Sequence, residues 1–166
     1  AVHGRSEPDL GWGWMNNFRW KGLNVHAHFQ GQLGGNTFNE GRQRTYFELK
    51  GHDQDQSGKA TELKKPFDYY TELYHGYDWM AEFIEPGWFV KLRTLSVTYG
   101  LGPSVLEPLR LVGLSQVDLG LIVRNAWTLT DYTGWDPEAG SVLHRVEGEG
   151  TFPKQRQWTA YMEITF

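Results

Sequence analysis

The sequence contains no cysteine among its 166 residues. A disulfide framework and a thiolate metal site are therefore excluded, and thiols give no indication of the redox compartment. Apolar runs are short as well, and none approaches the ~18–20 residues that a membrane-spanning helix needs. The first residues, AVHGR, lack the apolar stretch of a secretory signal peptide. A mature secreted chain and an internal fragment would both begin in this way.

An excess of positive charge is also missing, because 16 Lys and Arg face 20 Asp and Glu, and no nucleic-acid partner is indicated. The patterns of nucleophile elbows, phosphate loops, zinc helices and dinucleotide sites do not occur, so we expect no enzyme, no cofactor and no metal centre. Aromatic residues and glycine are plentiful instead, with 8 Trp, 8 Tyr, 9 Phe and 20 Gly. This composition is typical of a β protein with one wet face.

The last ten residues, QWTAYMEITF, alternate between apolar and polar side chains. Every even position from Trp158 to Phe166 is apolar, and every odd position except the amphipathic Tyr161 is polar. Successive side chains of a strand point to opposite faces, so this stretch predicts a strand with one apolar face. The strand ends on an aromatic residue, as the closing strand of a bacterial outer-membrane barrel commonly does.

Similar alternation predicts four earlier strands, at about 12–20, 23–33, 88–99 and 117–125. Lys21-Gly22 is a tight-turn signal that joins the first two. The predicted fold is all-β: an antiparallel meander of about five strands, with two long loops and short helical turns at 69–85 and 103–114. We expect one domain over 1–166, made of a hairpin (1–33), a long loop (34–87), a second hairpin (88–125), a loop (126–156) and a terminal strand (157–166).

Three segments resemble the C-terminal region of SusC/RagA-type TonB-dependent outer-membrane receptors. FVKLRTLSVTY at 89–99 is similar to that family's strand F-x-[KR]-[LI]-R-x-L-x-[LV]-x-Y. NAWTLTDYTGWDPE at 125–138 resembles its loop N-L-[FW]-T-x-T-x-Y-x-G-x-D-P-E. Phe152-Pro153, Arg156 and the last strand resemble its Y-P-x-x-R-x-[FWY] ending. In addition to these three, the earlier segment GGNTFN at 34–39 resembles the family's G-G-x-x-[FY]-N loop start.

The resemblance implies part of an outer-membrane barrel wall that takes up oligosaccharides or peptides, with a plug and a TonB box that this sequence lacks. The partners implied are the remainder of the barrel and a surface lipoprotein. The residues implied are a non-catalytic signature loop and a closing strand that includes Trp158 and Phe166. The signature-loop residues are Asn125, Trp127, Asp131, Tyr132, Gly134, Asp136, Pro137 and Glu138.

A second hypothesis is a non-catalytic accessory subunit, expected in the periplasm, whose small open sheet or sandwich docks on a larger membrane assembly. The apolar strand faces fit either reading, because they could contact lipid or pack against a second protein layer. Five strands alone are too few to close a barrel, which needs at least ~8.

Several other side chains could carry a site, and each has a simpler interpretation. His26 and His28 could share a metal, but they read as solvated polar residues of one strand face. Asp131, Asp136 and Glu138 could hold calcium, but they fit turn geometry better.

Scattered acids could form a glycosidase pair, although acids in a long loop are usually solvated: Glu48, Asp53, Asp55, Glu62, Asp68, Glu72, Asp78, Glu82 and Glu85. Aromatic residues could stack on sugars, line the membrane interface or pack the loop: Tyr69, Tyr70, Tyr74, Tyr77, Trp79 and Trp88.

Overall fold

The computed structural model describes residues 4–72, 79–108, 113–140, 145–148 and 151–166. They fall into two compact units. The sheet unit comprises Gly11–Gly31, Val90–Leu129 and Lys154–Phe166, and the loop unit comprises Ala1–Leu10, Gln32–Phe89 and Thr130–Pro153. Within the described ranges, no helix is both long and apolar enough to cross a membrane. The assignment of all 166 residues to a single domain stays a prediction.

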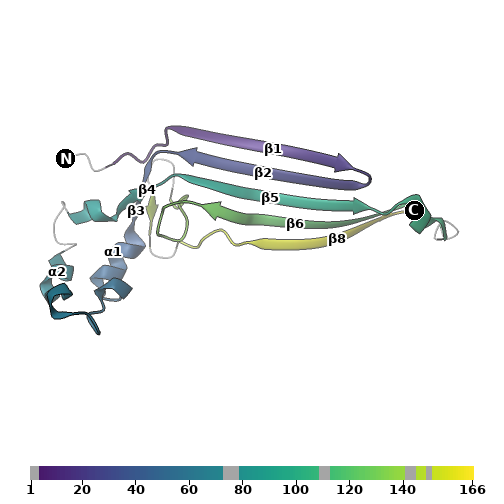
Figure 1. Cartoon of the computed structure of the whole chain (residues 1–166). Coiled ribbons are helices and arrows are strands. Elements are labelled where there is room, and N and C mark those ends of the chain that lie inside the picture. The colour runs from purple at the N-terminus through teal and green to yellow at the C-terminus, as the bar shows by residue number, and fades with distance from the viewer. Residues whose placement is uncertain (1–3, 73–78, 109–112, 141–144, 149–150) are drawn as a thin grey trace. The chain divides into compact units, whose positions relative to one another are not determined.

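The sheet unit is built on five long strands that lie side by side in the order β1-β2-β5-β6-β8 (Figure 1). The all-β fold and the five predicted strands are confirmed. The strands are β1 (Leu10–Trp20), β2 (Leu23–Leu33), β5 (Phe89–Gly100), β6 (Gln116–Leu129) and β8 (Gln157–Thr165). The short helix α3 (Pro103–Leu106) follows β5, where a helical turn was expected. The rest of that predicted turn includes 109–112, which lie outside the described residues.

Register places the alternating apolar residues of β5, β6 and β8 on one face of this sheet. Val97 lies opposite Leu121, and Leu121 lies opposite Ala160. The neighbouring row joins Leu119 to Met162. Residues that lie directly opposite in an antiparallel pair share a face, so these rows form one continuous apolar surface. Trp158 and Met162 on it remain 65% and 61% exposed.

The other face of the sheet is mainly polar. Gln157 lies opposite Arg124, Glu163 lies opposite Asp118, and Thr159 between them lies opposite Ile122, an apolar residue of this face. The Tyr161 ring covers Gly120, where an added Cβ would come within 2.1 Å of the ring, and its hydroxyl is 2.8 Å from Thr98 Oγ1. Tyr161 is therefore accommodated at a polar position of the strand, because its ring packs on Gly120 and its hydroxyl lies beside Thr98 on the polar face.

The β1–β2 turn confirms the signal in Lys21-Gly22. Both residues have positive φ, 44° and 85°, which is the backbone of the two-residue turn that matches strand twist. Gly22 lies so close to Gly100 that an added Cβ would be 2.9 Å from the Gly100 carbonyl oxygen. The amide of Gly100 donates to the Gly22 carbonyl oxygen at 2.9 Å. Glycine is thus required here by both conformation and space.

Strand β6 runs four residues further than its predicted end at Asn125. The register shifts between Leu92 and Thr94 of β5, whose partners are Trp127 and Arg124. Asn125 occupies the resulting bulge with a φ of 50°, a conformation that Asn tolerates better than most residues. The bulge interrupts the two-residue alternation, and the predicted strand therefore ends at Asn125.

The loop unit contains a second, three-stranded sheet that the sequence did not predict. Its order is β4-β3-β7, formed by β4 (Ile84–Pro86), β3 (Asn36–Asn39) and β7 (Val146–Glu147). Strand β3 pairs antiparallel with β4 and parallel with β7, with Phe38 opposite Val146. The two segments described as long loops are therefore joined by backbone pairing.

Short helices complete the loop unit: α1 (Glu40–Phe47), α2 (Phe67–Glu72), η1 (His52–Gln54), η2 (Thr61–Leu63) and η3 (Trp79–Phe83). The Asn39 side chain caps α1 by accepting from the Arg42 amide at 2.8 Å. Phe83 and Phe89 are almost fully buried in this unit. Tyr46 packs edge-on against Phe83 with ring centroids 5.7 Å apart. Helices α2 and η3 lie in the region where partial helix was expected.

Candidate functional site

The Asp131–Glu138 part of the signature loop lies in the loop unit and is held by two buried carboxylates. Glu85 comes from β4 and Glu147 from β7, so the small sheet places one acid on each side of β3. Glu85 is 6% exposed and Glu147 is 1% exposed. A buried charge is tolerated only when its hydrogen-bonding capacity is filled, and the loop supplies most of the donors.

Glu85 binds Thr133 through three contacts. It accepts from the Thr133 amide at 2.7 Å and from the Thr133 hydroxyl at 2.8 Å to each of its oxygens. Asn39 Nδ2 and Arg42 Nη1 also donate to Glu85, both at 3.1 Å. The guanidinium of Arg42 additionally lies over the rings of Tyr46 and Phe83. One carboxylate therefore ties the loop, β3 and α1 together.

Glu147 fixes the next two residues of the loop through their backbone. Its Oε1 accepts from the Trp135 amide at 2.9 Å, and its Oε2 accepts from the Asp136 amide at 3.0 Å. Asp136 then accepts from the Glu138 amide at 2.9 Å, which is an Asx turn with Pro137 at its centre. The carboxylate of Asp136 is thus engaged in turn geometry, the simpler of its two interpretations.

Tyr132 and Gly134 form the packed centre of the loop. Tyr132 is 6% exposed, and its hydroxyl has no hydrogen-bond partner among the described residues. Burial, followed by the negative charge of Glu147, raises the pKa of this phenol far above its usual value. An added Cβ at Gly134 would be 2.5 Å from the Tyr132 ring. Only glycine at this position lets the ring occupy its place.

Arg145 is a buried cation of the loop unit. It is 7% exposed, and its Nη1 donates to the Gly87 carbonyl oxygen at 3.2 Å. Added Cβ atoms at Gly87 and Gly35 would lie 2.7 and 3.3 Å from that nitrogen, so the guanidinium fills the space left by two glycines. Desolvation lowers the pKa of Arg145, while the charge of Glu138 opposes that shift.

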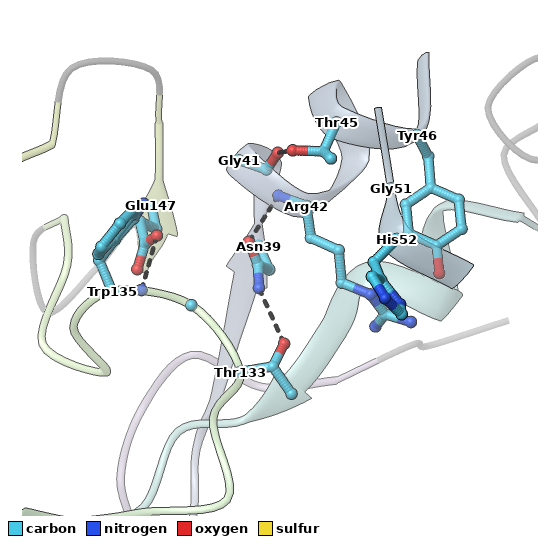
Figure 2. Close-up of a pocket in the computed structure, with 11 residues that line it drawn as sticks. Asn39, Gly41, Arg42, Thr45, Tyr46, Gly51, His52, Thr133, Trp135 and Glu147 are labelled. Carbon is cyan, nitrogen blue, oxygen red and sulfur yellow. Dashed lines mark hydrogen bonds between the residues drawn. The ribbon is translucent and has the colours of Figure 1, made fainter. Parts of the chain in front are cut away.

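A cavity of about 620 Å³ opens between α1, the η1 region and the signature loop. Figure 2 shows Trp135 and Glu147 on one side and Arg42, Tyr46 and His52 on the other, with Asn39 and Gly41 between them. Its volume lies within the ~300–1,000 Å³ of small-molecule sites. It is lined by Asn39, Gly41, Arg42, Thr45, Tyr46, Gly51, His52, Thr133, Gly134, Trp135 and Glu147.

The structure divides the other predicted site residues between the two units. In the loop unit, Asp131 accepts from the Trp88 indole at 3.0 Å, and the Pro137 carbonyl oxygen accepts from Thr37 Oγ1 at 3.4 Å. In the sheet unit, Trp127 is an exposed residue of β6, and the side-chain Nδ2 of Asn125 donates to the Gln155 carbonyl oxygen at 3.0 Å. Trp158 lies in β8, and Phe166 follows its last residue.

Among the residues that the structure describes, the alternative candidates do not assemble into a site. His26 lies 2.7 Å from the Asn17 side-chain oxygen, and no cluster of metal-ligating side chains is found in the described ranges. The expectation that the scattered acids are solvated is wrong for Glu85, because Thr133, Asn39 and Arg42 donate to it in the interior. Tyr70 is buried and packs against Tyr69. Asp78, Tyr74 and Tyr77 lie outside the described residues.

Sequence reasoning missed the residues that build the cavity opposite the loop. Asn39 stands at the end of the GGNTFN segment, whose resemblance to a loop start was the available signal. Arg42, Tyr46 and His52 follow in a region without regular alternation. Glu147 belongs to a two-residue strand whose partner is more than 100 residues earlier, so no local pattern marks it.

The chain is similar to a sequence and to solved structures of known proteins, and no protein-family model matches it. The TonB-dependent receptor P3 of Formosa agariphila is 29% identical over 177 residues, which cover 99% of this chain and 17% of the receptor. The RagAB peptide transporter structure has a TM-score of 0.68 at 26% identity and covers 97% of this chain. The RagAB peptide importer in its "closed-closed" state has a TM-score of 0.67 at 23% identity.

In each comparison the chain spans only about 17–18% of the length of its relative. The matched part nevertheless includes almost the whole of this chain, both units included. The resemblance to SusC/RagA-type TonB-dependent receptors, first drawn from three sequence motifs, is therefore confirmed by sequence similarity and by fold.

Proposed function

We propose that this chain forms part of the wall and of the outer loops of a TonB-dependent outer-membrane receptor for nutrient uptake, with oligosaccharide or peptide as cargo. In this role the chain binds and guides the cargo and is not an enzyme. The observation that carries the proposal is the continuous apolar face that β5, β6 and β8 share, set against a mainly polar opposite face. Lipid-facing and lumen-facing residues alternate in the same way along the strands of a membrane barrel.

Strand length supports this reading. A tilted strand needs ~9–11 residues to cross a bilayer, and β8 has 9, β1 and β2 have 11, β5 has 12 and β6 has 14. Ordinary strands of globular proteins are about half as long. All five strands therefore have the length that a barrel wall demands.

The partners follow from the two edges of the sheet and from the loop unit. β1 and β8 are the outer strands of the sheet, and an outer strand offers unpaired backbone groups to a neighbour. The remainder of a receptor barrel would pair with them and close the wall. A surface lipoprotein would then cover the outer loops, and TonB would act on the plug of the receptor.

Spin labels at single cysteines test the proposal, because the sequence has no cysteine of its own. Labels at Leu121 and Met162 would report the apolar face, and labels at Thr159 and Glu163 the opposite face. In the membrane-embedded protein, we expect the first pair to collide often with oxygen and rarely with a water-soluble nickel chelate. We expect the reverse order for the second pair, with a label at Glu62 as a solvent-exposed control.

Low collision rates with both reagents at Leu121 and Met162 would mean that protein covers the apolar face. That outcome would reject the wall and favour the accessory subunit. High nickel accessibility at both positions would reject either reading.

A further inference from the structure

We propose that the polar face of the five-stranded sheet carries a binding site for hydrogen phosphate, in a groove formed by β1, β2 and β5. This inference goes beyond the proposed function, because the ligand is a small ion and not the cargo. The groove has a volume of about 280 Å³, just below the ~300–1,000 Å³ of sites for larger molecules. Its polar lining residues are Asn17, Arg19, Asn24, His26, Ser96 and Thr98.

The groove lies on the polar face and within the sheet unit. Asn17 of β1 faces His26 of β2, with 2.7 Å between Asn17 Oδ1 and His26 Nδ1. Thr98 of β5 continues the face toward β8, since its Oγ1 is 2.8 Å from the Tyr161 hydroxyl. The lining residues therefore point away from the apolar surface that β5, β6 and β8 share.

Arg19 brings a positive charge to the groove that nothing nearby neutralises. Among the described residues, no carboxylate lines the groove, and the Arg19 guanidinium has no hydrogen bond or ion pair. The acids of this face, Asp118 and Glu163, lie opposite each other on β6 and β8. Strands β1 and β6 are three strand spacings apart, about 14 Å, which is too far for an ion pair. The planar fork of Arg19 is thus available to an oxyanion.

Donors from the other two strands favour a tetrahedral oxyanion. Asn24 on β2 carries an amide NH₂ group and Ser96 on β5 carries a hydroxyl, and neither is engaged by a described residue. Together with Arg19 on β1, they place donors on three neighbouring strands. A tetrahedral anion accepts hydrogen bonds from several directions, and a groove with donors on several sides suits it.

The His26 ring distinguishes one tetrahedral oxyanion from another. Asn17 Oδ1 can only accept, so Nδ1 of His26 carries the hydrogen. In the neutral ring Nε2 is then an acceptor, and no donor to it lies in the described part of the chain. Hydrogen phosphate has an O–H group that can donate to Nε2, whereas sulfate has none. His26 acts here as a hydrogen-bond acceptor and not as a metal ligand.

A lipid phosphate is excluded by the same chemistry. The phosphodiester of a phospholipid carries no O–H group and would leave the acceptor on His26 without a partner. An acceptor that faces the lone pairs of an anion costs binding energy. The site should therefore select the free ion over both sulfate and a phosphodiester.

The test titrates the purified full-length protein in detergent with sodium phosphate, sodium sulfate or dimethyl phosphate, followed by calorimetry. The titrations are made at pH 8 in about 0.15 M NaCl, where exposed charges more than about 8 Å apart are largely screened. We expect phosphate to bind at one site per chain, and sulfate and dimethyl phosphate to bind at least about tenfold more weakly.

Two variants and a matched control assign the binding to the groove. Arg19→Gln should raise the Kd of phosphate at least about tenfold, because a charge-assisted contact is lost. His26→Leu should bring the Kd values of phosphate and sulfate to within about twofold of each other, because the acceptor is gone. The control Arg124→Gln removes a cation from the same face, opposite Gln157 and outside the groove, and should change the Kd of phosphate less than twofold.

Three outcomes would overturn the proposal: the parent does not bind phosphate, it binds sulfate equally well, or Arg124→Gln weakens binding as much as Arg19→Gln. The last result would mean that phosphate only senses the general charge of the face. Arg19 and His26 lie on exposed or half-buried positions of the hairpin, so both variants should keep the melting temperature of the parent. The spin-label experiment involves no anion, and its result does not depend on this site.

Discussion

The substitution Glu147→Gln tests the claim that a buried carboxylate holds the signature loop. Each oxygen of Glu147 accepts one backbone amide, from Trp135 at 2.9 Å and from Asp136 at 3.0 Å. A Gln amide keeps one acceptor and turns the other into a donor that faces an N–H group. One charge-assisted bond, worth ~1.5–3 kcal/mol, is lost, and the remaining bond becomes a weaker neutral one. The local free energy of opening should fall by about 2–4 kcal/mol.

Amide hydrogen exchange measured by mass spectrometry gives the direct readout. A loss of about 2–4 kcal/mol corresponds to roughly 30- to 700-fold faster exchange, at tenfold per ~1.4 kcal/mol. The acceleration should be confined to peptides that contain Trp135 and Asp136. The control is Glu62→Gln, which makes the same chemical change at an exposed residue of η2. Equal exchange of the loop in Glu147→Gln and in the parent would refute the reasoning.

Three further predictions concern single side chains. The pKa of Tyr132 is raised in the fold, so its contribution to stability is present below the usual tyrosine pKa near ~10 and is lost as pH rises above it. The melting temperature should therefore fall less between pH 9 and 11 in Tyr132→Phe than in the parent. An equal fall of the melting temperature in both proteins would contradict this. Gly134→Ala should destabilise the loop unit by ~1–3 kcal/mol, measured by thermal unfolding, because its Cβ would overlap the Tyr132 ring. Under the proposed function, Leu121→Arg should weaken folding into lipid vesicles by ~2–4 kcal/mol in a urea titration, whereas Thr159→Arg on the polar face should not.

The sheet unit could be predicted because each strand carries its own signal. The alternation in the last ten residues predicts β8 almost to its ends, and Lys21-Gly22 predicts the turn between β1 and β2. The predicted strand boundaries are wrong where the two-residue alternation is interrupted. The bulge at Asn125 breaks the period of two, and the last four residues of β6 were assigned to a loop.

The loop unit could not be predicted in the same way, because its order comes from contacts between distant segments. Strands of two to four residues are too short to show a period. Glu85 and Glu147 look like solvated acids in the sequence, and only the fold brings Thr133 and the amides of Trp135 and Asp136 to them. Composition predicts that an acid prefers water, but several donors gathered around it reverse that preference.

The signature loop itself separates into residues that build the fold and residues that face outward. In the pattern Y-x-G-x-D-P-E, Tyr132 fills the interior, Gly134 makes room for its ring, and Asp136 forms the turn before Pro137. The open position between glycine and aspartate is occupied by Trp135, which contributes its backbone to Glu147 and its exposed side chain to the cavity. A residue at that position can change without altering a buried contact, since only its amide is used by the framework. The loop framework should therefore tolerate a substitution at Trp135 better than one at Tyr132 or Gly134.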